Sequence, residues 1–216
     1  MAAESPGRTG RAYRSPRRAQ AAEETHARIL DAARRLFLEH GYAPVTVGDI
    51  ARAAGTAVPT VYASTGGKAA VLATIIDAAV RDPIVEHTLA EVRAAADARE
   101  AVRRTAHGVR TDNERYHDVV RVMVTAAATD ESAAETLAAA DADYRAALAD
   151  VAAGLDGRGA LRPGLALGKA TDILWFLLGH QAWHLYVAEL GWSWDEAERW
   201  LGEQAAIALL APDPSG

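Results

Sequence analysis

Helical periodicity is the feature of this sequence that most restricts its fold. From Thr25 onward, apolar residues recur at intervals of three and four, and no segment alternates apolar and polar residues as a half-buried strand does. Alanine, the residue with the highest helix propensity, supplies 51 of the 216 residues. Codon bias in a GC-rich genome is the simplest source of this excess, but the excess favours helices all the same. We therefore predict an all-α fold.

Glycine, proline and capping residues divide the chain into helices and loops. The apolar stripes are interrupted at Gly41, Gly55 and Pro83, and a long turn is expected from Gly154 to Gly164. The expected helices span residues 25–40, 47–54, 57–63, 68–82, 84–95, 98–110, 114–128, 131–153, 168–189 and 194–211.

Charge is distributed unevenly along the chain. The formal net charge is −6, so the chain as a whole is not expected to coat nucleic acid. Residues 1–72, however, carry 10 basic and 6 acidic groups, whereas residues 73–216 carry 13 basic and 23 acidic groups. This asymmetry predicts that the N-terminal third contacts a polyanion.

Both ends of the chain lack apolar periodicity, and we expect residues 1–24 and 212–216 to be disordered. The N-terminal arm is basic, with arginines at Arg8, Arg11, Arg14, Arg17 and Arg18. Such an arm can follow DNA phosphates or enter a minor groove. An inert solvated tail is the alternative, and the composition does not separate the two.

The composition excludes several classes of function. The absence of cysteine excludes a disulfide scaffold, a thiolate metal site and a cysteine nucleophile. No apolar run approaches the roughly 20 residues that a membrane helix needs, and the N-terminus lacks the apolar segment of a secretory signal. We therefore expect a cytoplasmic protein without a membrane partner. No phosphate loop, nucleophile elbow or carboxylate pair indicates an enzyme, so we assign no catalytic residue and no cofactor.

Two short helices joined by a glycine turn, over residues 46–62, form a helix-turn-helix pattern. Thr46 precedes Asp49 by three positions, as in a capping box with Asp in place of Glu. Ala51 is small where the two helices cross, and Gly55 supplies the turn.

The second helix of this pattern has one inward and one outward side. Ile50 and Val61 are expected to fill the space between the helices. The opposite side is then free to enter a major groove. Its residues are Val58, Pro59, Thr60, Tyr62 and Ser64.

At these residues the sequence resembles the TetR family of bacterial transcriptional regulators. The family pattern is a capping threonine, then I-A-x-x-A-G, then T-[LV]-Y, and a lysine that opens the fourth helix. The matching residues are Thr46, Ile50-Ala51, Ala54-Gly55, Thr60-Val61-Tyr62 and Lys68. The C-terminal half also looks like the family, in Gly159–Gly164, in Asp172-Ile173-Leu174-Trp175 and in Gly191-Trp192-Ser193.

The resemblance implies a three-helix DNA-binding domain at residues 25–72 and a helical effector-binding and dimerisation domain at residues 73–211. The sequence departs from the family pattern around the second helix of the pair. Ala57 stands where a serine cap is common, although Thr56 can cap one residue earlier, and Thr65 replaces a phenylalanine. The loop at Gly66-Gly67 is therefore expected to be more mobile than usual.

The resemblance assigns Thr60, Tyr62 and Lys68 to the DNA backbone. Thr46 would cap its helix and also offer a hydroxyl group to a phosphate. Lys68 would add its charge beside the positive N-terminus of the fourth helix. Local packing is the alternative role for Thr60 and Tyr62, and a solvated surface position is the alternative for Lys68.

The same resemblance places Val58, Pro59 and Ser64 against base edges. Valine and proline offer only apolar contacts, for instance to a thymine methyl group. Because this helix has no Arg, Asn or Gln for a bidentate base contact, we expect specificity to depend on DNA shape, on the basic arm or on Arg52.

Aromatic and polar residues in the C-terminal half predict a cavity for a small effector. The candidate lining residues are Met123, Tyr144, Trp175, Phe176, His180 and Trp183. Ordinary core or interface packing is the alternative for each of them. The concentration of aromatic residues between 175 and 200 predicts a homodimer contact through the last two helices, which would form a four-helix bundle with the partner.

His180 and His184 are four residues apart, a spacing that can bind a metal ion. Gln181 stands where an H-E-x-x-H motif has glutamate, so we predict no metal site and expect both histidines to pack at a dimer seam or in a pocket.

These observations predict a dimeric transcriptional regulator, and we expect a repressor. It would bind a near-palindromic double-stranded DNA operator and be released by an unknown small-molecule effector. One alternative is a helical small-molecule-binding protein or enzyme with a vestigial helix-turn-helix; another is a DNA reader controlled by partner proteins. The presence of both Tyr62 and Lys68 favours a functioning DNA reader.

Overall fold

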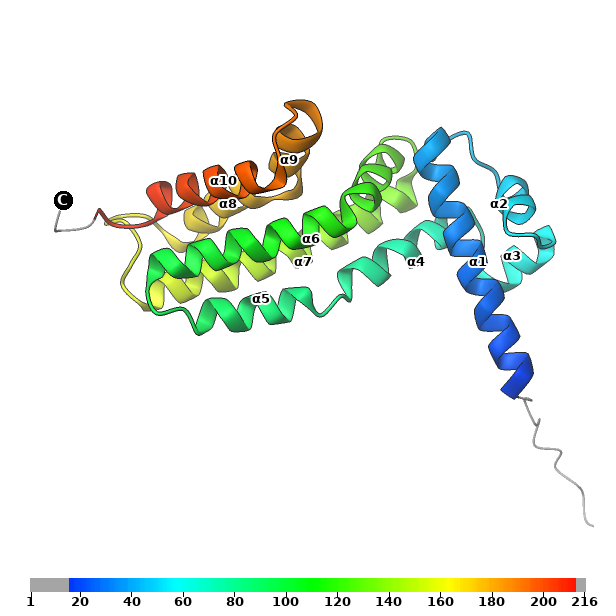
Figure 1. The fold of residues 1–216 in the computed structure, drawn as a ribbon, viewed down its shortest axis with the longest axis horizontal. Helices are drawn as coiled ribbons and strands as arrows, with labels where there is room; N and C mark the ends of the chain where they lie inside the picture. Colours follow the sequence, from blue (N-terminus) through cyan, green and yellow to red (C-terminus); the bar gives the residue numbers. More distant parts are fainter. Residues whose placement is uncertain (1–15, 213–216) are drawn as a thin grey trace, which may run out of the picture.

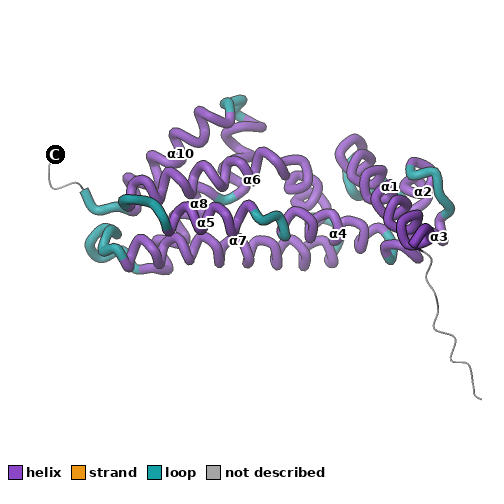
Figure 2. The backbone as a smooth tube through the Cα atoms, turned by 60° about the horizontal axis from the view of Figure 1, so that its bottom comes forward, coloured by secondary structure: helices purple, strands orange, loops and turns teal. Residues whose placement is uncertain are grey.

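The computed structural model describes residues 16–212, and the fold is all-α (Figure 1). Helices α1 to α3 form a small unit at one end, and α4 leads from it along an elongated body formed by the later helices (Figures 1 and 2). The elements are α1 (Pro16–His40), α2 (Val47–Ala53), α3 (Val58–Thr65), α4 (Lys68–Val80), α5 (Ile84–Arg93), α6 (Ala98–Ala127), α7 (Glu131–Gly157), α8 (Leu167–Leu178), α9 (His180–Trp183), the π-helical turn η1 (His184–Glu189) and α10 (Trp194–Leu209).

One hydrophobic core is centred on the N-terminal unit. Ile29 and Phe37 of α1 pack with Ile50, Val61 and Leu72 from α2 to α4, and all five are buried. The same core takes in side chains from the end of α6 and the start of α7, namely Val119, Val122, Met123, Ala126 and Ala133. The two units therefore share a core, and α4 continues across the domain boundary expected at residue 72.

A second core holds the C-terminal body together. It lies among α5 to α8, the short α9 and α10, and its largest wholly buried side chain is Trp183. Leu148 of α7, Leu174 and Leu178 of α8 and Leu201 of α10 meet there. Burial of such apolar surface is the main stabilising contribution to a fold of this kind.

Capping side chains begin several of these helices. The capping box predicted at Thr46 and Asp49 is present, with the Thr46 hydroxyl group accepting from the Asp49 amide. Ser193 and Glu196 form a second box at α10, and Asp130 caps α7. Each cap satisfies amide groups that the first turn of a helix leaves unpaired.

The first helix begins at Pro16, so the prediction of a disordered arm as far as residue 24 is wrong for residues 16–24. Proline is tolerated in a first turn, and the alanines that follow favour a helix. Hydrogen bonds spaced by four residues support it, from Gln20 to Glu24 and from the Thr25 hydroxyl group to the Ala21 carbonyl oxygen. Arg8, Arg11 and Arg14 of the predicted arm, and residues 213–216 of the predicted tail, lie outside the described residues.

Helix α6 is continuous where the sequence predicted two helices with a break at residues 111–113. Thr111 and Asn113 usually favour turns because their side chains compete for backbone hydrogen bonds. Here the Thr111 hydroxyl group donates to the His107 carbonyl oxygen, and the Asn113 amide donates to that of Val109, one helical turn back. The polar side chains are thus satisfied within the helix.

The single helix predicted for residues 168–189 is divided at Gly179. The Leu178 carbonyl oxygen accepts two side-chain hydrogen bonds, from the Tyr144 hydroxyl group at 2.7 Å and from the Trp183 indole at 3.0 Å. Gly179 is extended, with φ −67° and ψ 157°, and a Cβ atom there would lie 2.3 Å from the Trp175 carbonyl oxygen. Side chains of the core therefore replace the backbone hydrogen bonds that would have continued α8.

Candidate functional site

Helices α2 and α3 form the helix-turn-helix that the sequence predicted. Ile50, Ala51 and Val61 are buried between them. Gly55 has a φ of +63°, a left-handed conformation that glycine adopts without strain. Helix α3 begins after Ala57 without a side-chain cap, so Thr56 does not supply the alternative cap considered above.

The outer face of α3 is exposed at most of the predicted contact positions. Val58 is 39% exposed, Tyr62 is 54% exposed, and Pro59 is also exposed, whereas Thr60 is half-buried. The Tyr62 ring lies against the backbone of Gly67, where a Cβ atom would be 3.2 Å from the ring. This contact holds the ring at the start of α4 while its outer side stays open to solvent.

Two other residues predicted to contact DNA form interactions with other groups of the protein. The Ser64 hydroxyl group is hydrogen-bonded to His26 Nδ1 of α1 at 3.0 Å, so Ser64 faces α1 rather than standing free. The Lys68 ammonium group donates to the Ala43 carbonyl oxygen at 3.1 Å and lies 4.0 Å from the centre of the Tyr42 ring. Burial lowers the pKa of Lys68.

Arg52 and Thr46 lie at the N-terminal unit's surface. The Arg52 side chain is 79% exposed, and its guanidinium group pairs with Asp49 at 2.9 Å. Thr46 is exposed, but its hydroxyl group is already hydrogen-bonded in the capping box: it donates to the Asp49 carboxylate and accepts from the Asp49 amide.

A hydrogen bond joins the N-terminal unit to the C-terminal body. The Tyr42 hydroxyl group donates to Asp130 Oδ2 at 3.0 Å, and Asp130 is the residue that caps α7. Burial and this carboxylate raise the pKa of Tyr42. Tyr42 therefore contacts both Lys68 and the N-terminus of α7. The sequence did not predict the contact between Tyr42 and Asp130, because these two residues are 88 positions apart.

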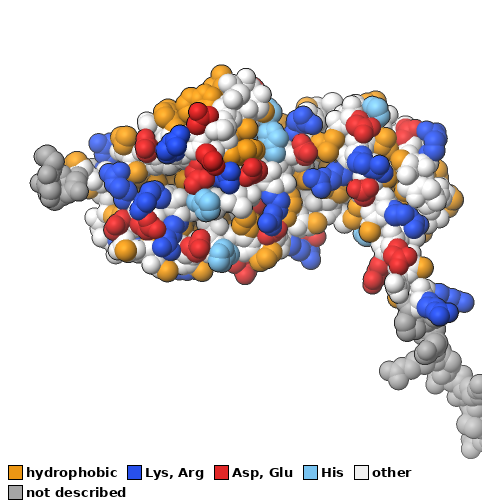
Figure 3. Space-filling view, in the orientation of Figure 1, with side chains coloured by type: hydrophobic (Ala, Val, Ile, Leu, Met, Phe, Trp, Pro, Cys, Tyr) orange, Lys and Arg blue, Asp and Glu red, His pale blue; other side chains and the backbone are white. Residues whose placement is uncertain are grey.

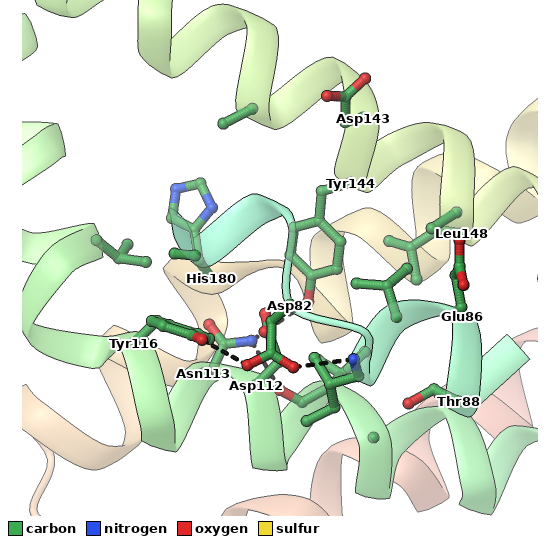
Figure 4. Close-up of a pocket in the computed structure, with 18 of the residues that line it drawn as sticks. Asp82, Glu86, Thr88, Asp112, Asn113, Tyr116, Asp143, Tyr144, Leu148 and His180 are labelled. Atoms are coloured by element: carbon green, nitrogen blue, oxygen red, sulfur yellow. Dashed lines mark hydrogen bonds between the residues drawn. The ribbon is translucent and has the colours of Figure 1, made fainter. Parts of the chain in front are cut away.

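A cavity of about 560 Å³ lies in the C-terminal body (Figure 4). Its walls come from the end of α4, from α5, from the middle of α6 and from α7, and His180 of α9 closes one side. Its volume is within the range of cavities that hold small-molecule ligands.

Three of the six predicted pocket residues line this cavity, namely Met123, Tyr144 and His180. The other three do not. Trp183 is wholly buried in the core and Phe176 is 79% exposed on α8. Trp175 packs edge-on behind the cavity wall, against Tyr144 and His180.

Polar side chains gather at one part of the cavity, where Figure 4 shows Asp82, Asp112, Asn113 and Tyr116 close together. Asp82 accepts from the Tyr116 hydroxyl group at 2.6 Å and from Arg115 at 2.7 Å, and these interactions hold its pKa below the usual range. Asp112 is largely buried beside it. Burial, together with the Asp82 carboxylate, raises the pKa of Asp112 to about 6.

The sequence reasoning missed this polar group, although a signal for it exists. Val109, Asp112, Tyr116 and Val119 follow one another at helical spacing, so two polar residues interrupt an apolar stripe. A continuous helix over this segment would have placed Asp112 on the buried face.

The two histidines considered as metal ligands have separate partners. His180 Nδ1 lies 3.6 Å from Asp141, and His184 lies 3.6 Å from Glu189. Within residues 16–212, no group of three or more His, Cys, Asp or Glu side chains is arranged to hold a metal ion. In that same range no single helix is long and apolar enough to cross a membrane, and α3 with Lys68–Arg93 reaches that length and composition only across a 46° bend.

Comparison with known proteins identifies the N-terminal unit. The sequence model described as bacterial regulatory proteins, tetR family, matches residues 29–75, which include the helix-turn-helix. No curated protein sequence matches the chain.

Solved structures share the fold over most of the chain. NalD of Pseudomonas aeruginosa, the secondary repressor of the MexAB-OprM multidrug efflux pump, is 25% identical, with a TM-score of 0.70 over 88% of this chain and 98% of that one. The fatty acid degradation regulator FadR of Bacillus halodurans is 17% identical, with a TM-score of 0.70 over 84% and 94%. A transcriptional regulator of Saccharomonospora viridis in complex with choline is 20% identical, with a TM-score of 0.68 over 88% and 100%.

The family match covers the helices that would meet DNA, and the structural likeness extends through the C-terminal body. Residues 29–75 thus carry the DNA-binding unit of the tetR family of bacterial regulatory proteins, and the chain that bears this unit is a DNA-binding transcriptional regulator.

Proposed function

We propose that this regulator is a cytoplasmic, homodimeric repressor that leaves its operator when a small-molecule effector fills the cavity. The observation that carries this proposal is the course of α4. The helix begins at Lys68 beside the helix-turn-helix and ends at the cavity, where Ala79 contributes to the wall. A ligand that displaces the end of α4 would also move its beginning.

The proposed DNA interface is the exposed side of α3 with the start of α4. Tyr62 and Thr60 would contact phosphates, and Val58 and Pro59 would face base edges. Helix α4 begins at Lys68, and its N-cap residue Gly67 makes no side-chain hydrogen bond to the first turn, so the first amide groups of the helix would be available to a phosphate. Thr46 and Arg52 would contribute from α2, and Ser64 only if its hydrogen bond to His26 is exchanged.

Exposed apolar residues on α8 and α10 support the proposed dimer. Phe176 is 79% exposed and Ile207 is 60% exposed. Figure 3 shows hydrophobic side chains gathered along the edge of the body over α9 and α10. Contiguous apolar surface of this kind marks contact sites between proteins. The partner's α8 and α10 would complete a four-helix bundle, and the dimer would present two copies of α3 to the two half-sites of a palindrome.

Effector control requires a difference in affinity between two conformations. A ligand that bound both conformations with equal affinity would not shift the equilibrium between them. Similar proteins support a small-molecule effector, since one is a repressor of a multidrug efflux pump and another is in complex with choline. The cavity also argues against a DNA reader without an effector, which would be expected to have a filled C-terminal core.

Selection of genomic fragments by the purified full-length protein tests this proposal. We expect enrichment of a near-palindromic site whose half-sites lie about one helical turn, roughly 34–36 Å, or a multiple of it apart. Titration at two salt concentrations should show affinity that falls steeply with salt. A folded dimer that enriches no site, at either salt concentration, would contradict the proposal.

A further inference from the structure

We propose that the effector is an amphipathic cation, whose protonated amine or quaternary ammonium group lies against Asp112 and whose apolar body lies along the aliphatic wall of the cavity. This inference rests on the proposed effector function and names the class of ligand that the cavity would take.

The aliphatic wall occupies most of the cavity. Leu89 of α5, Val109 and Met123 of α6 and Leu148 and Val151 of α7 line it. Because these side chains offer no hydrogen bonds, the matching part of a ligand must be apolar, and its burial supplies the non-specific part of the affinity.

Acidic groups dominate the charged lining. Arg81 is the only arginine or lysine among the lining residues that the structure describes, and its guanidinium group pairs with Asp77, outside the lining, at 2.9 Å. Burial lowers the pKa of His180, so its imidazole is neutral at neutral pH. The carboxylates of the lining are those of Asp82, Glu86, Asp112, Asp141 and Asp143.

Among the described residues, Asp112 differs from Asp82 and Asp141 in having neither a basic nor an imidazole side chain at ion-pair distance. Asp82 is 12% exposed and is paired with Arg115, and Asp141 lies beside His180. In the part of the chain that the structure describes, no side chain or backbone group hydrogen-bonds to Asp112 or forms an ion pair with it. Arg115, the nearest cation to influence it, is already engaged by Asp82.

An ionised carboxylate without a partner is costly in an apolar cavity. The raised pKa of Asp112, about 6, expresses this cost, yet at neutral pH the group is still mostly ionised. A ligand cation would remove the cost by forming the missing ion pair. A neutral ligand would leave this free-energy cost unchanged, and an anionic ligand would be repelled by the carboxylates of the lining.

The size of the cavity is a second observation that points to a ligand, independent of the acidic residues. A metal ion would not fill about 560 Å³ lined by aliphatic side chains. The combination of a large apolar space with one unpaired carboxylate fits a ligand that is mainly apolar and carries one positive charge.

Four probes with the same alkyl chain test the charge preference. Decylamine, decyltrimethylammonium, decanol and decanoate would each be titrated into the full-length protein by calorimetry. We expect both cations to bind at least tenfold more tightly than decanol, and decanoate to bind most weakly. Equal binding of decanol and decylamine, or tighter binding of decanoate, would overturn the inference.

The substitution Asp112→Asn tests the residue. It keeps the shape of the side chain and removes its charge, so we expect most of the preference for the cations to disappear while decanol binds as before. Asp118→Asn is the matched control, because Asp118 lies on the same helix but outside the cavity lining. A cation preference that survives Asp112→Asn would overturn the assignment.

Operator release, measured with the same probes, separates this inference from the proposed function. Release by decanol as readily as by decylamine would support an effector-controlled repressor and overturn the cation inference. Tight, Asp112-dependent cation binding without release would support the inference and contradict the proposed control of DNA binding. Failure of all four probes to bind would overturn the inference.

Discussion

Asp112 is the residue whose environment most clearly departs from that of an ordinary surface carboxylate. Its pKa is about 6 in the folded protein, compared with a usual value of 3.8. The folded protein therefore binds more protons than the unfolded chain between about pH 4 and pH 6, and stability falls as the pH rises through this window. Above pH 6 the full cost of the ionised group remains.

Asp112→Asn is accordingly expected to stabilise the protein without ligand. The gain should be about 1–3 kcal/mol at pH 7, because each unit of pKa shift corresponds to about 1.4 kcal/mol and a partly solvated group realises less than the full amount. Urea unfolding at pH 7 and at pH 4 measures it, and the difference between variant and parent should shrink at pH 4. Comparing the two proteins cancels the titration of groups that do not interact with Asp112, whereas the electrostatic coupling between Asp112 and Asp82 contributes to the measured difference. An unchanged stability at pH 7 would show that Asp112 is better solvated than its burial implies.

Lys68 and Tyr62 are expected to bind DNA without regard to sequence. Lys68→Ala should weaken binding to the operator and to random duplexes alike, and should reduce the slope of log affinity against log salt by about one. Tyr62→Phe should cost about 1 kcal/mol on both duplexes, the usual contribution of one hydrogen bond. Fluorescence anisotropy measures these effects, with Arg99→Ala as the control because that exposed arginine lies at the start of α6, outside the helix-turn-helix and the proposed dimer contact. A change in base preference at a single position would instead assign the altered residue to a base edge.

At the scale of whole helices, the sequence predicted the N-terminal unit well. Helices α2 and α3 of this unit are short and bounded by glycines, and the capping box at Thr46 and the turn at Gly55 are local features. The longer helices were harder to predict because distant contacts determine where they end. The break at Gly179 depends on Tyr144 and Trp183 donating to the Leu178 carbonyl oxygen, and no local pattern encodes the contact from Tyr144.

The site could be predicted only in part for the same reason. Exposure of Val58, Pro59 and Tyr62 follows from the periodicity of a single short helix. The cavity depends on how five helices pack, so the sequence identified Met123, Tyr144 and His180 but also included residues that face the core or the solvent. The misplaced break in α6 hid Asp112, which the sequence reasoning assigned to a loop.

The close approach of α5 and α6 makes a prediction about helix packing. A Cβ atom at Gly108 would lie 2.2 Å from Thr88 Oγ1 and 2.3 Å from its Cγ2, so α6 has no room for a side chain there. Gly108→Ala should therefore lower the free energy of unfolding by about 1–3 kcal/mol, despite the better helix propensity of alanine. Thermal unfolding measures the effect.

Gly154→Ala is the control for this prediction, because nothing lies within 4 Å of a Cβ atom at Gly154 in α7. That change should stabilise the protein by about 0.5–1 kcal/mol. The double variant Gly108→Ala, Thr88→Ala should recover part of the loss. A neutral Gly108→Ala would mean that α5 moves away from α6 at little cost.

At the scale of the whole molecule, the proposed dimer can be tested through Phe176. The side chain is 79% exposed in the single chain, so Phe176→Arg should leave the fold of each subunit intact while placing a charge in the proposed contact. We expect a monomer by analytical ultracentrifugation and a large loss of affinity for a palindromic site. Val124→Arg is the control, since Val124 is also exposed but lies on α6. A dimer that persists in Phe176→Arg would place the contact elsewhere.

The position of Lys68 above the Tyr42 ring makes the DNA-bound state observable by magnetic resonance. The ammonium group lies 4.0 Å from the ring centre, so the aromatic ring current should shift the neighbouring methylene protons upfield in the free protein. Lys68 and Lys169 are the only lysines in the sequence, and isotopic labelling of lysine would therefore give one shifted and one unshifted set of signals. If the Lys68 ammonium group leaves the Tyr42 ring to bind a phosphate, the Lys68 signals should move toward the position of the Lys169 signals when operator DNA is added. The spectrum would then report directly the fraction of subunits in which this internal contact has been replaced.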